Sequence, residues 1–167
     1  PSRLVRERRR IAEQLASAGR NNRPGEIATL YHRSRTLPGA AEGVPFAFDA
    51  AAEARANGSH EQTAAFLRMA LDLLDPDDAR HEEILRELAI AQAESLQIDP
   101  AIITAWQAIE AMEADGSDPD EIADFSASIA IALKHRAGAT PEQWTPFVTL
   151  GLQRVKTERG LGWARLS

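Results

Sequence analysis

Residues 46–76 constrain the fold of this chain more than any other stretch. They hold two segments with apolar residues at helical spacing, separated by Asn57-Gly58 and followed by Pro76. Alanines recur on the first segment where two helices would cross, and the Asn-Gly pair tolerates the left-handed backbone that ends a helix. The pattern therefore predicts two antiparallel helices. A pair of this size cannot bury its apolar face alone, so we expect further helices to stack against it.

The composition is that of an ordinary globular domain. The chain has 167 residues, of which 44% are apolar and 5% are aromatic, so helix packing must rely on small residues. Cysteine is absent, which excludes disulfides and thiolate metal sites. No apolar run reaches the ~18 residues of a membrane span, and no secretory signal is visible. We expect one cytoplasmic domain over residues 1–167, and the start at Pro1 indicates a piece of a larger multidomain protein.

Helical periodicity continues along nearly the whole chain, and no segment shows sustained strand alternation. The stretch 38–45 contains two prolines and two glycines and is expected to be a loop. Later helices are expected to begin at the cap pairs Asp99-Pro100, Asp118-Pro119 and Thr140-Pro141. These signals predict an all-α fold of about eight helices joined by short loops.

The apolar stripe of each helix predicts its buried face. The stripe of the first helix is Leu4, Ile11, Leu15 and Ala18. The stripe of the fourth helix is Phe66, Leu67, Ala70, Leu71 and Leu74. Ser59 and Gln62 have the spacing of a capping box. Trp106 and Trp144 are expected to fill seams between helices, and Trp163 either covers the last helix or is left exposed.

Charge is distributed unevenly along the chain. Residues 1–36 contain nine arginines and three acidic residues, for a net charge of +6. Residues 37–133 contain four basic and twenty acidic residues, for a net charge of −16. Residues 134–167 contain six basic and two acidic residues, for +4. The acidic middle should repel nucleic acid and attract basic or amphipathic peptides.

The densest basic run is at residues 6–10, where Arg6, Arg9 and Arg10 share one face of the predicted first helix. These arginines are the candidate partner-binding residues. They could contact phosphate, pack against the acidic middle, or meet a neighbouring domain. No aromatic residues are interleaved with them, as a single-strand stacking platform would require.

Patterns for catalysis and metal binding are missing. The sequence has no phosphate-binding loop of the GxxxxGK[ST] type, and its serines have no GxSxG setting. His32, His60, His81 and His135 are scattered, and His81 lacks the second histidine of HExxH. The acidic residues at 75–82 are expected to stabilise a helix N-terminus. We therefore expect no catalytic residue, no cofactor and no metal.

Residues 46–76 resemble a tetratricopeptide repeat. Gly58 matches the inter-helix glycine, Ala51 and Ala54 match small positions of the first helix, and Ala70-Leu71 match the alanine region of the second. Thr63 replaces the most typical small alanine, so the repeat is degenerate. The resemblance implies a tetratricopeptide-like right-handed helical array.

A longer resemblance covers residues 5–95. RRRIAEQL (8–15), RPGEIATLYHRS (23–34) and ARHEEILRELAIAQ (79–92) are similar to the helical region of large bacterial regulators, the signal-transducing P-loop ATPases linked to LuxR-type DNA-binding modules. In such proteins these helices serve inducer sensing or partner contact. The chain itself shows neither a phosphate loop nor a closing helix-turn-helix.

These observations predict a non-catalytic interaction or sensor domain of a bacterial transcriptional regulator. Its partner would be a protein or peptide segment, including other domains of the same chain. Two alternatives stay open: a small-ligand-binding helical domain with an apolar pocket, and a nucleic-acid-binding helical bundle that uses Arg6, Arg9 and Arg10.

Overall fold

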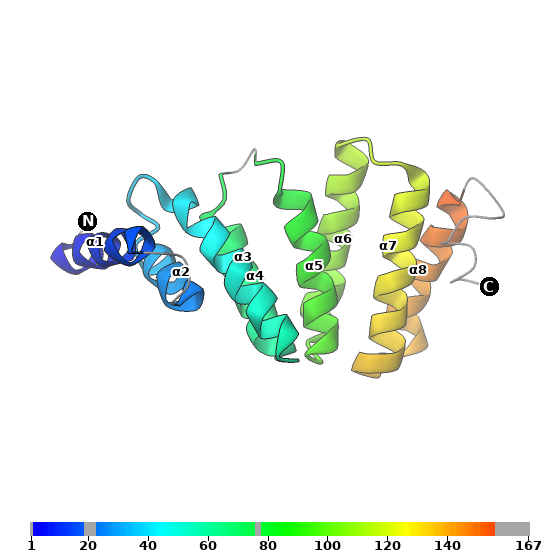
Figure 1. Ribbon diagram of the computed structural model, residues 1–167. Coiled ribbons are helices and arrows are strands. Elements are labelled where there is room, and N and C mark those ends of the chain that lie inside the picture. Colours follow the sequence, from blue (N-terminus) through cyan, green and yellow to red (C-terminus); the bar gives the residue numbers. More distant parts are fainter. Residues whose placement is uncertain (1, 19–22, 76–77, 156–167) are drawn as a thin grey trace. The chain divides into compact units, whose positions relative to one another are not determined.

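The computed structural model describes residues 2–18, 23–75 and 78–155. In these ranges the chain forms eight α-helices and no strand (Figure 1), which confirms the predicted all-α fold. The helices are α1 (Arg3–Ser17), α2 (Pro24–Arg33), α3 (Val44–Ala56), α4 (His60–Leu73), α5 (His81–Glu94), α6 (Ile98–Ala114), α7 (Pro119–Ala132) and α8 (Pro141–Arg154). A 3₁₀ turn at Ala40–Gly43 lies within the predicted loop 38–45, and a π-helical turn at Leu133–Ala137 follows α7.

Prolines mark the starts of three helices. Pro24, Pro119 and Pro141 are the first residues of α2, α7 and α8. A proline suits this position because the first amides of a helix have no partner within the helix. The Asp118 carboxylate accepts a hydrogen bond from the amide of Asp120 at 2.9 Å. The predicted starts of α7 and α8 are therefore confirmed.

The predicted start of α6 is wrong by two residues. The helix begins at Ile98 with Gln97 as its cap residue, so Asp99 and Pro100 lie inside the first turn. Proline is tolerated there for the same reason as at the first helical position. Asp99 instead places a negative charge beside the free amides of the first turn.

The predicted capping box of α4 does not form. Ser59 is the cap residue, but its side chain makes no capping hydrogen bond. Its ψ of 76° departs from the extended backbone that aims a cap hydroxyl at the next amides. Instead, the Thr63 hydroxyl donates to the carbonyl oxygen of Ser59 at 3.0 Å.

The chain divides into two compact units, residues 1–84 and 85–167, with the division inside α5. The sequence itself predicts one domain over residues 1–167. Each unit has its own buried apolar side chains.

In the first unit, α3 packs against α4, α2 packs against both, and α1 packs against α2. The buried face of α3 is mostly small, because Ala47, Ala50, Ala51 and Ala54 are all at most 5% exposed. Small residues at these positions let the α3 and α4 backbones approach closely. The alanine side predicted for this helix is therefore confirmed.

The buried face of α4 is displaced from its predicted stripe. Leu67 and Ala70 are buried as expected, together with Thr63, Ala64 and Leu73, whereas Phe66 and Leu71 are only half-buried. The Phe66 ring lies over Gly25 of α2, where a Cβ atom would be 2.8 Å from the ring tip. Phe66 therefore serves the contact between α2 and α4.

The predicted buried face of α1 is wrong. Leu4 is 57% exposed and Ile11 is 38% exposed, whereas Arg9 and Ala12 are buried. Helix α1 turns the face of Arg9 and Ala12 towards α2 because the arginine finds hydrogen-bond partners just beyond the end of that helix, at Ser34 and Pro38. The apolar pattern alone gives no sign of this.

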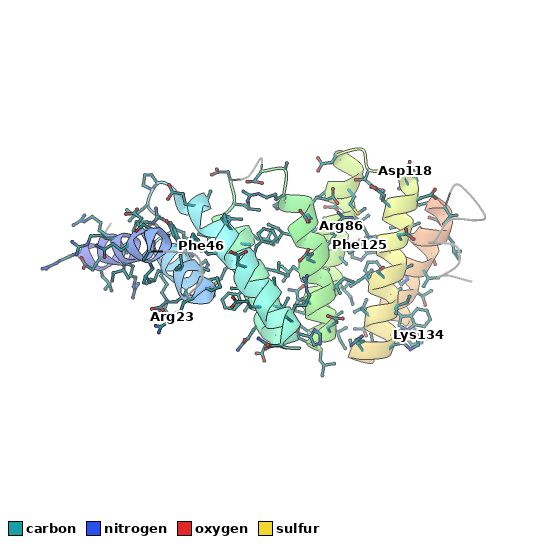
Figure 2. The ribbon with its side chains drawn as sticks, in the orientation of Figure 1. Arg23, Phe46, Arg86, Asp118, Phe125 and Lys134 are labelled. Atoms are coloured by element: carbon teal, nitrogen blue, oxygen red, sulfur yellow. The ribbon has the colours of Figure 1, made fainter. Side chains whose placement is uncertain are left out.

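In the second unit, α7 packs against α8 and contacts α6. Figure 2 shows the length of α7, with Asp118 at its start and Lys134 just beyond its end. More than half of the residues of α7 are buried, namely Ile122, Ala123, Phe125, Ser126, Ala127, Ile129, Ala130 and Ala132. Leu85, Leu88 and Ala91 of α5 are buried.

The turns after the helices have a left-handed residue. Gly58, Gly116 and Gly138 have φ of 69°, 74° and 68°, and glycine adopts this backbone without strain. The turn between α5 and α6 has Leu96 at φ 64°, the one non-glycine with positive φ in the described ranges. Its amide donates to the carbonyl of Ala93 at 3.1 Å, and its side chain is 65% exposed.

Across the described parts of the chain, no helix has the length and apolar character needed to cross a membrane.

Candidate functional site

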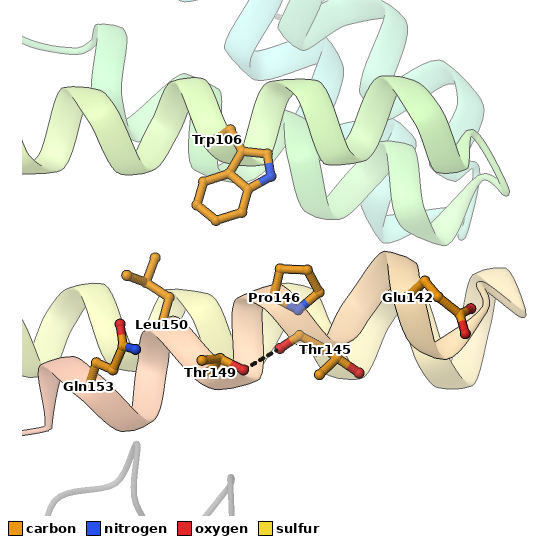
Figure 3. A pocket seen from close by; sticks show the side chains of 7 residues that line it. All are labelled: Trp106, Glu142, Thr145, Pro146, Thr149, Leu150 and Gln153. Atoms are coloured by element: carbon orange, nitrogen blue, oxygen red, sulfur yellow. Dashed lines mark hydrogen bonds between the residues drawn. The ribbon is translucent and has the colours of Figure 1, made fainter.

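An open groove lies between α6 and α8 of the second unit, with a volume of about 490 Å³ (Figure 3). Helix α6 contributes Trp106, and α8 contributes Glu142, Thr145, Pro146, Thr149, Leu150 and Gln153. Figure 3 shows the Trp106 indole facing Pro146 and Leu150 across the groove. These three residues give the groove an apolar centre, and the α8 threonines and Gln153 form a polar rim.

The Trp106 ring is fixed on one face and exposed on the other. It stacks on Phe147 with ring centroids 4.8 Å apart and an angle of 26° between the planes. Phe147 is fully buried, whereas Trp106 is 37% exposed. Trp106 was expected to fill a seam between helices, and it does so only with the face that meets Phe147. Its free face is available to a ligand.

Helix α8 begins with a capping box. The amide of Thr140 donates to Oε1 of Gln143 at 2.9 Å, and the Thr140 side chain accepts from the amide of Gln143. These hydrogen bonds fix the first turn of the helix, which carries Glu142. Backbone and Thr140 hydrogen bonds hold the pKa of the Glu142 carboxyl below its ordinary value, so this carboxylate is charged at neutral pH.

Pro146 lies inside α8 and has no amide hydrogen to donate. The carbonyl of Glu142, four residues earlier, therefore lacks its usual helical partner. Residues four apart share one face of a helix, and both residues line the groove. The groove rim thus carries the Glu142 carboxylate, which attracts cationic donors.

An ion pair connects α6 and α8 beside the groove. Nη2 of Arg154 donates to Oε1 of Glu113, two residues that lie 41 positions apart in sequence. Both residues lie near the C-terminal ends of their helices. The ion pair therefore holds these two ends together. On the other side of α8, the ammonium of Lys134 lies 5.1 Å from the centre of the Trp144 ring.

The three predicted partner-binding arginines do not form one exposed surface. Arg9 is only 6% exposed, whereas Arg6 and Arg10 are exposed. The guanidinium of Arg10 lies 3.9 Å from the carboxylate of Glu7. Arg9 therefore has an internal role, and only Arg6 and Arg10 of this set can meet a partner directly.

Arg9 fastens α1 to the end of α2. Its Nε donates to Oγ of Ser34 at 3.2 Å, its Nη2 donates to the Ser34 carbonyl at 3.2 Å, and its Nη1 donates to the Pro38 carbonyl. The guanidinium carbon also lies 4.8 Å from the centre of the Tyr31 ring. These contacts satisfy carbonyls at the C-terminal end of α2 and explain why a charged side chain is buried here.

Tyr31 connects this cluster to the 3₁₀ turn. Its hydroxyl donates to Oε2 of Glu42 at 3.3 Å. Burial raises the pKa of the Tyr31 phenol above its ordinary 10.0, and the charge of Glu42 adds to the rise. The Tyr31 ring also lies against Gly43, where a Cβ atom would be 2.5 Å from Cβ of Tyr31.

Potential metal ligands do not gather in the described ranges, where no group of three or more histidine, aspartate or glutamate side chains could hold an ion. His32 instead pairs with Asp72, with Nε2 and Oδ2 at 2.8 Å. Asp78 accepts hydrogen bonds from Arg80, which lower the pKa of its carboxyl from 3.8 to about 2. Asp77 and Trp163 lie outside the described residues.

Comparison of the chain with family models, with curated proteins and with solved structures finds no match. The resemblance of residues 5–95 to bacterial regulators therefore stays a prediction. Sequence patterns pointed to Trp106 but not to Pro146, Thr149 and Leu150. A proline in the middle of a predicted helix was the signal that could have pointed to this face of α8.

Proposed function

We propose that this chain is a non-catalytic interaction domain whose groove between α6 and α8 binds a basic amphipathic peptide segment. The observation that carries the proposal is the half-exposed Trp106 ring opposite Pro146 and Leu150. An aromatic ring held on one face presents a flat apolar contact at low entropic cost, and such residues dominate peptide interfaces.

The charge around the groove selects a basic partner. Helices α6 and α7 together carry six acidic residues and neither lysine nor arginine. Glu142 lines the groove. A peptide with leucine on one face and lysine or arginine on the other would contact the indole and the acidic rim together.

The openness of the groove favours a peptide over a compact small molecule. Small-molecule sites usually enclose most of the ligand surface. Here one wall is α8 and the other is the single ring of Trp106, so a helical peptide can lie along the groove. The small-ligand alternative has no enclosed polar anchor in this groove to support it.

The wider setting of the domain is also a proposal. The similarity of residues 46–76 to a tetratricopeptide repeat, and of residues 5–95 to P-loop regulators, supports a sensor or interaction role in a cytoplasmic bacterial transcriptional regulator. Gly58 at the α3–α4 turn and the alanine face of α3 agree with a repeat of this kind. The peptide partner could then belong to another protein or to another domain of the same regulator.

A binding experiment tests the groove. The probe is a labelled synthetic helix of about five turns, with leucine on one face and lysine elsewhere, and its binding is followed by fluorescence anisotropy at low and physiological salt. The variant Thr149→Arg places a positive charge and a long side chain in the groove and should weaken binding about tenfold or more, a loss of about 1.4 kcal/mol. Gln62→Arg makes the same change in charge at an exposed position of α4 and should leave binding unaltered. Equal affinity for both variants, or no binding to the parent chain, would remove the support for this function.

A further inference from the structure

Helix α1 exposes a second apolar surface, separate from the groove. Leu4 and Ile11 are 57% and 38% exposed and lie seven residues apart, which places them on the same face two turns apart. Leu15, one turn further on, is half-buried beside them. We call Leu4, Ile11 and Leu15 the α1 stripe. The stripe runs along nearly the whole helix, while the face of Arg9 and Ala12 packs on α2.

Arginines flank the α1 stripe on both sides. Arg8 lies one turn from Leu4 and from Ile11, and is half-buried along one flank. Arg3 and Arg10 lie along the other flank and are exposed, and Glu7 lies on that flank too, with its carboxylate 3.9 Å from the guanidinium of Arg10. Glu7 and Glu13 are the two acidic residues of α1, so the helix has a net positive charge even when the buried Arg9 is left out.

The apolar α1 stripe and its flanking arginines together indicate the kind of partner that fits this surface. We propose that the α1 stripe docks an acidic amphipathic helix, with leucines or isoleucines against Leu4 and Ile11 and glutamates against Arg3, Arg8 and Arg10. An apolar stripe with residues at i and i+7 suits another helix lying alongside. Opposite charges on its flanks fix the register and increase the rate of association.

Two other occupants fit less well. A nucleic acid would meet the arginines but would also bury phosphates against Leu4 and Ile11, which desolvates charge without compensation. A second copy of α1 would bring one positively charged helix against another. The opposite preferences of the groove and the α1 stripe also allow one chain to hold a basic segment and an acidic segment together.

The test uses a labelled synthetic helix of about five turns, with leucine at i, i+4 and i+7 and glutamate elsewhere. Its binding to the full chain is measured by anisotropy. The double variant Leu4→Glu/Ile11→Glu should weaken binding about tenfold or more, since it removes both apolar contacts and adds repulsive charge. The control Gln62→Glu/Ala65→Glu makes the same change of charge at exposed positions of α4 and should have no effect. If circular dichroism shows that the first variant unfolds, Leu4→Ser/Ile11→Ser replaces it.

Three results would overturn the proposal. The first is equal affinity for a scrambled probe of the same composition, which would show general charge attraction. The second is preferential binding of duplex DNA that depends on Arg3 and Arg10 but not on Leu4. The third is a dimer of the chain alone that Leu4→Glu/Ile11→Glu dissociates, which would show that a second copy covers the stripe. Thr149→Arg should leave the binding of the acidic probe unchanged. The proposal for the α1 stripe and the proposal for the groove between α6 and α8 can therefore be refuted independently.

Discussion

Replacing Arg9 with methionine tests the reasoning about the first unit most directly. Methionine keeps an unbranched side chain of similar reach but cannot donate a hydrogen bond. The Ser34 carbonyl, the Ser34 hydroxyl and the Pro38 carbonyl each lose a donor. The Tyr31 ring loses the guanidinium that lies 4.8 Å from its centre.

The size of the effect follows from these contacts. A hydrogen bond to a charged group is worth about 1.5–3 kcal/mol, and a buried acceptor without a donor costs about 1–3 kcal/mol. The contact with Tyr31 adds about 1 kcal/mol. Removing a buried charge relieves part of this loss. We expect the free energy of unfolding to fall by about 3 kcal/mol, which for a chain of this size lowers Tm by roughly 6–12 °C.

Urea denaturation followed by far-UV circular dichroism gives the measurement. All three tryptophans lie in residues 85–167, so tryptophan fluorescence follows the second unit. If the chain unfolds in one transition, the fluorescence midpoint should shift together with the circular dichroism midpoint. Arg10→Met is the matched control, because Arg10 is exposed and its pair with Glu7 should contribute less than about 1 kcal/mol. If Arg9→Met and Arg10→Met destabilise equally, the contacts of Arg9 do not hold α1 in place. A double-mutant cycle with Ser34→Ala should give a coupling energy of at least about 0.5 kcal/mol.

Three further changes have defined outcomes. Leu96→Gly should raise the free energy of unfolding in urea by about 1 kcal/mol, because glycine adopts the left-handed backbone at this position without strain. Gly138→Ala should lower the free energy of unfolding by a similar amount. A destabilised Leu96→Gly variant would contradict the strain at Leu96. Gly43→Ala should destabilise by about 2 kcal/mol or more in the same assay, because the new Cβ would lie 2.5 Å from Cβ of Tyr31, and a neutral effect would mean that this contact relaxes freely. Tyr31 is the single tyrosine, so ultraviolet absorbance should show its phenol titrating with a pKa above 10.0, and Glu42→Gln should lower that midpoint. Because the folded-state pKa of Tyr31 is raised, its contribution to stability is present below pH 10 and declines as the pH rises through the folded-state value; a midpoint at or below 10.0 would refute the burial argument.

The sequence predicted the helices well because its signals for helix ends are local. Asp118-Pro119 and Thr140-Pro141 begin α7 and α8 where expected. Gly58 and Gly116 have a left-handed backbone in the turns that follow α3 and α6. Local chemistry decides such positions, since each cap or turn depends on residues within one helical turn.

The sequence predicted the buried faces less well, because a helix can rotate to satisfy partners distant in the chain. The apolar residues of α1 pointed to Leu4 and Ile11, but Arg9 reaches Ser34 and Pro38, 25 and 29 residues later. No periodicity in one helix carries that information. The groove was missed for the same reason, because its centre combines Trp106 with Pro146 and Leu150 from a helix that begins 35 residues after Trp106.

The alanine face of α3 has a consequence for how this domain can vary. Ala47, Ala50, Ala51 and Ala54 already have the smallest side chain apart from glycine, so almost every substitution adds volume at a tight crossing. In a cluster of leucines, single substitutions to smaller or differently shaped apolar residues can be accommodated, because neighbouring side chains fill the space. The α3–α4 contact cannot accommodate a larger side chain in this way, so a larger residue on α3 requires a second substitution on α4. Random mutagenesis should therefore show that single substitutions are rarely tolerated at these four positions. Most tolerated variants should carry a second, compensating substitution.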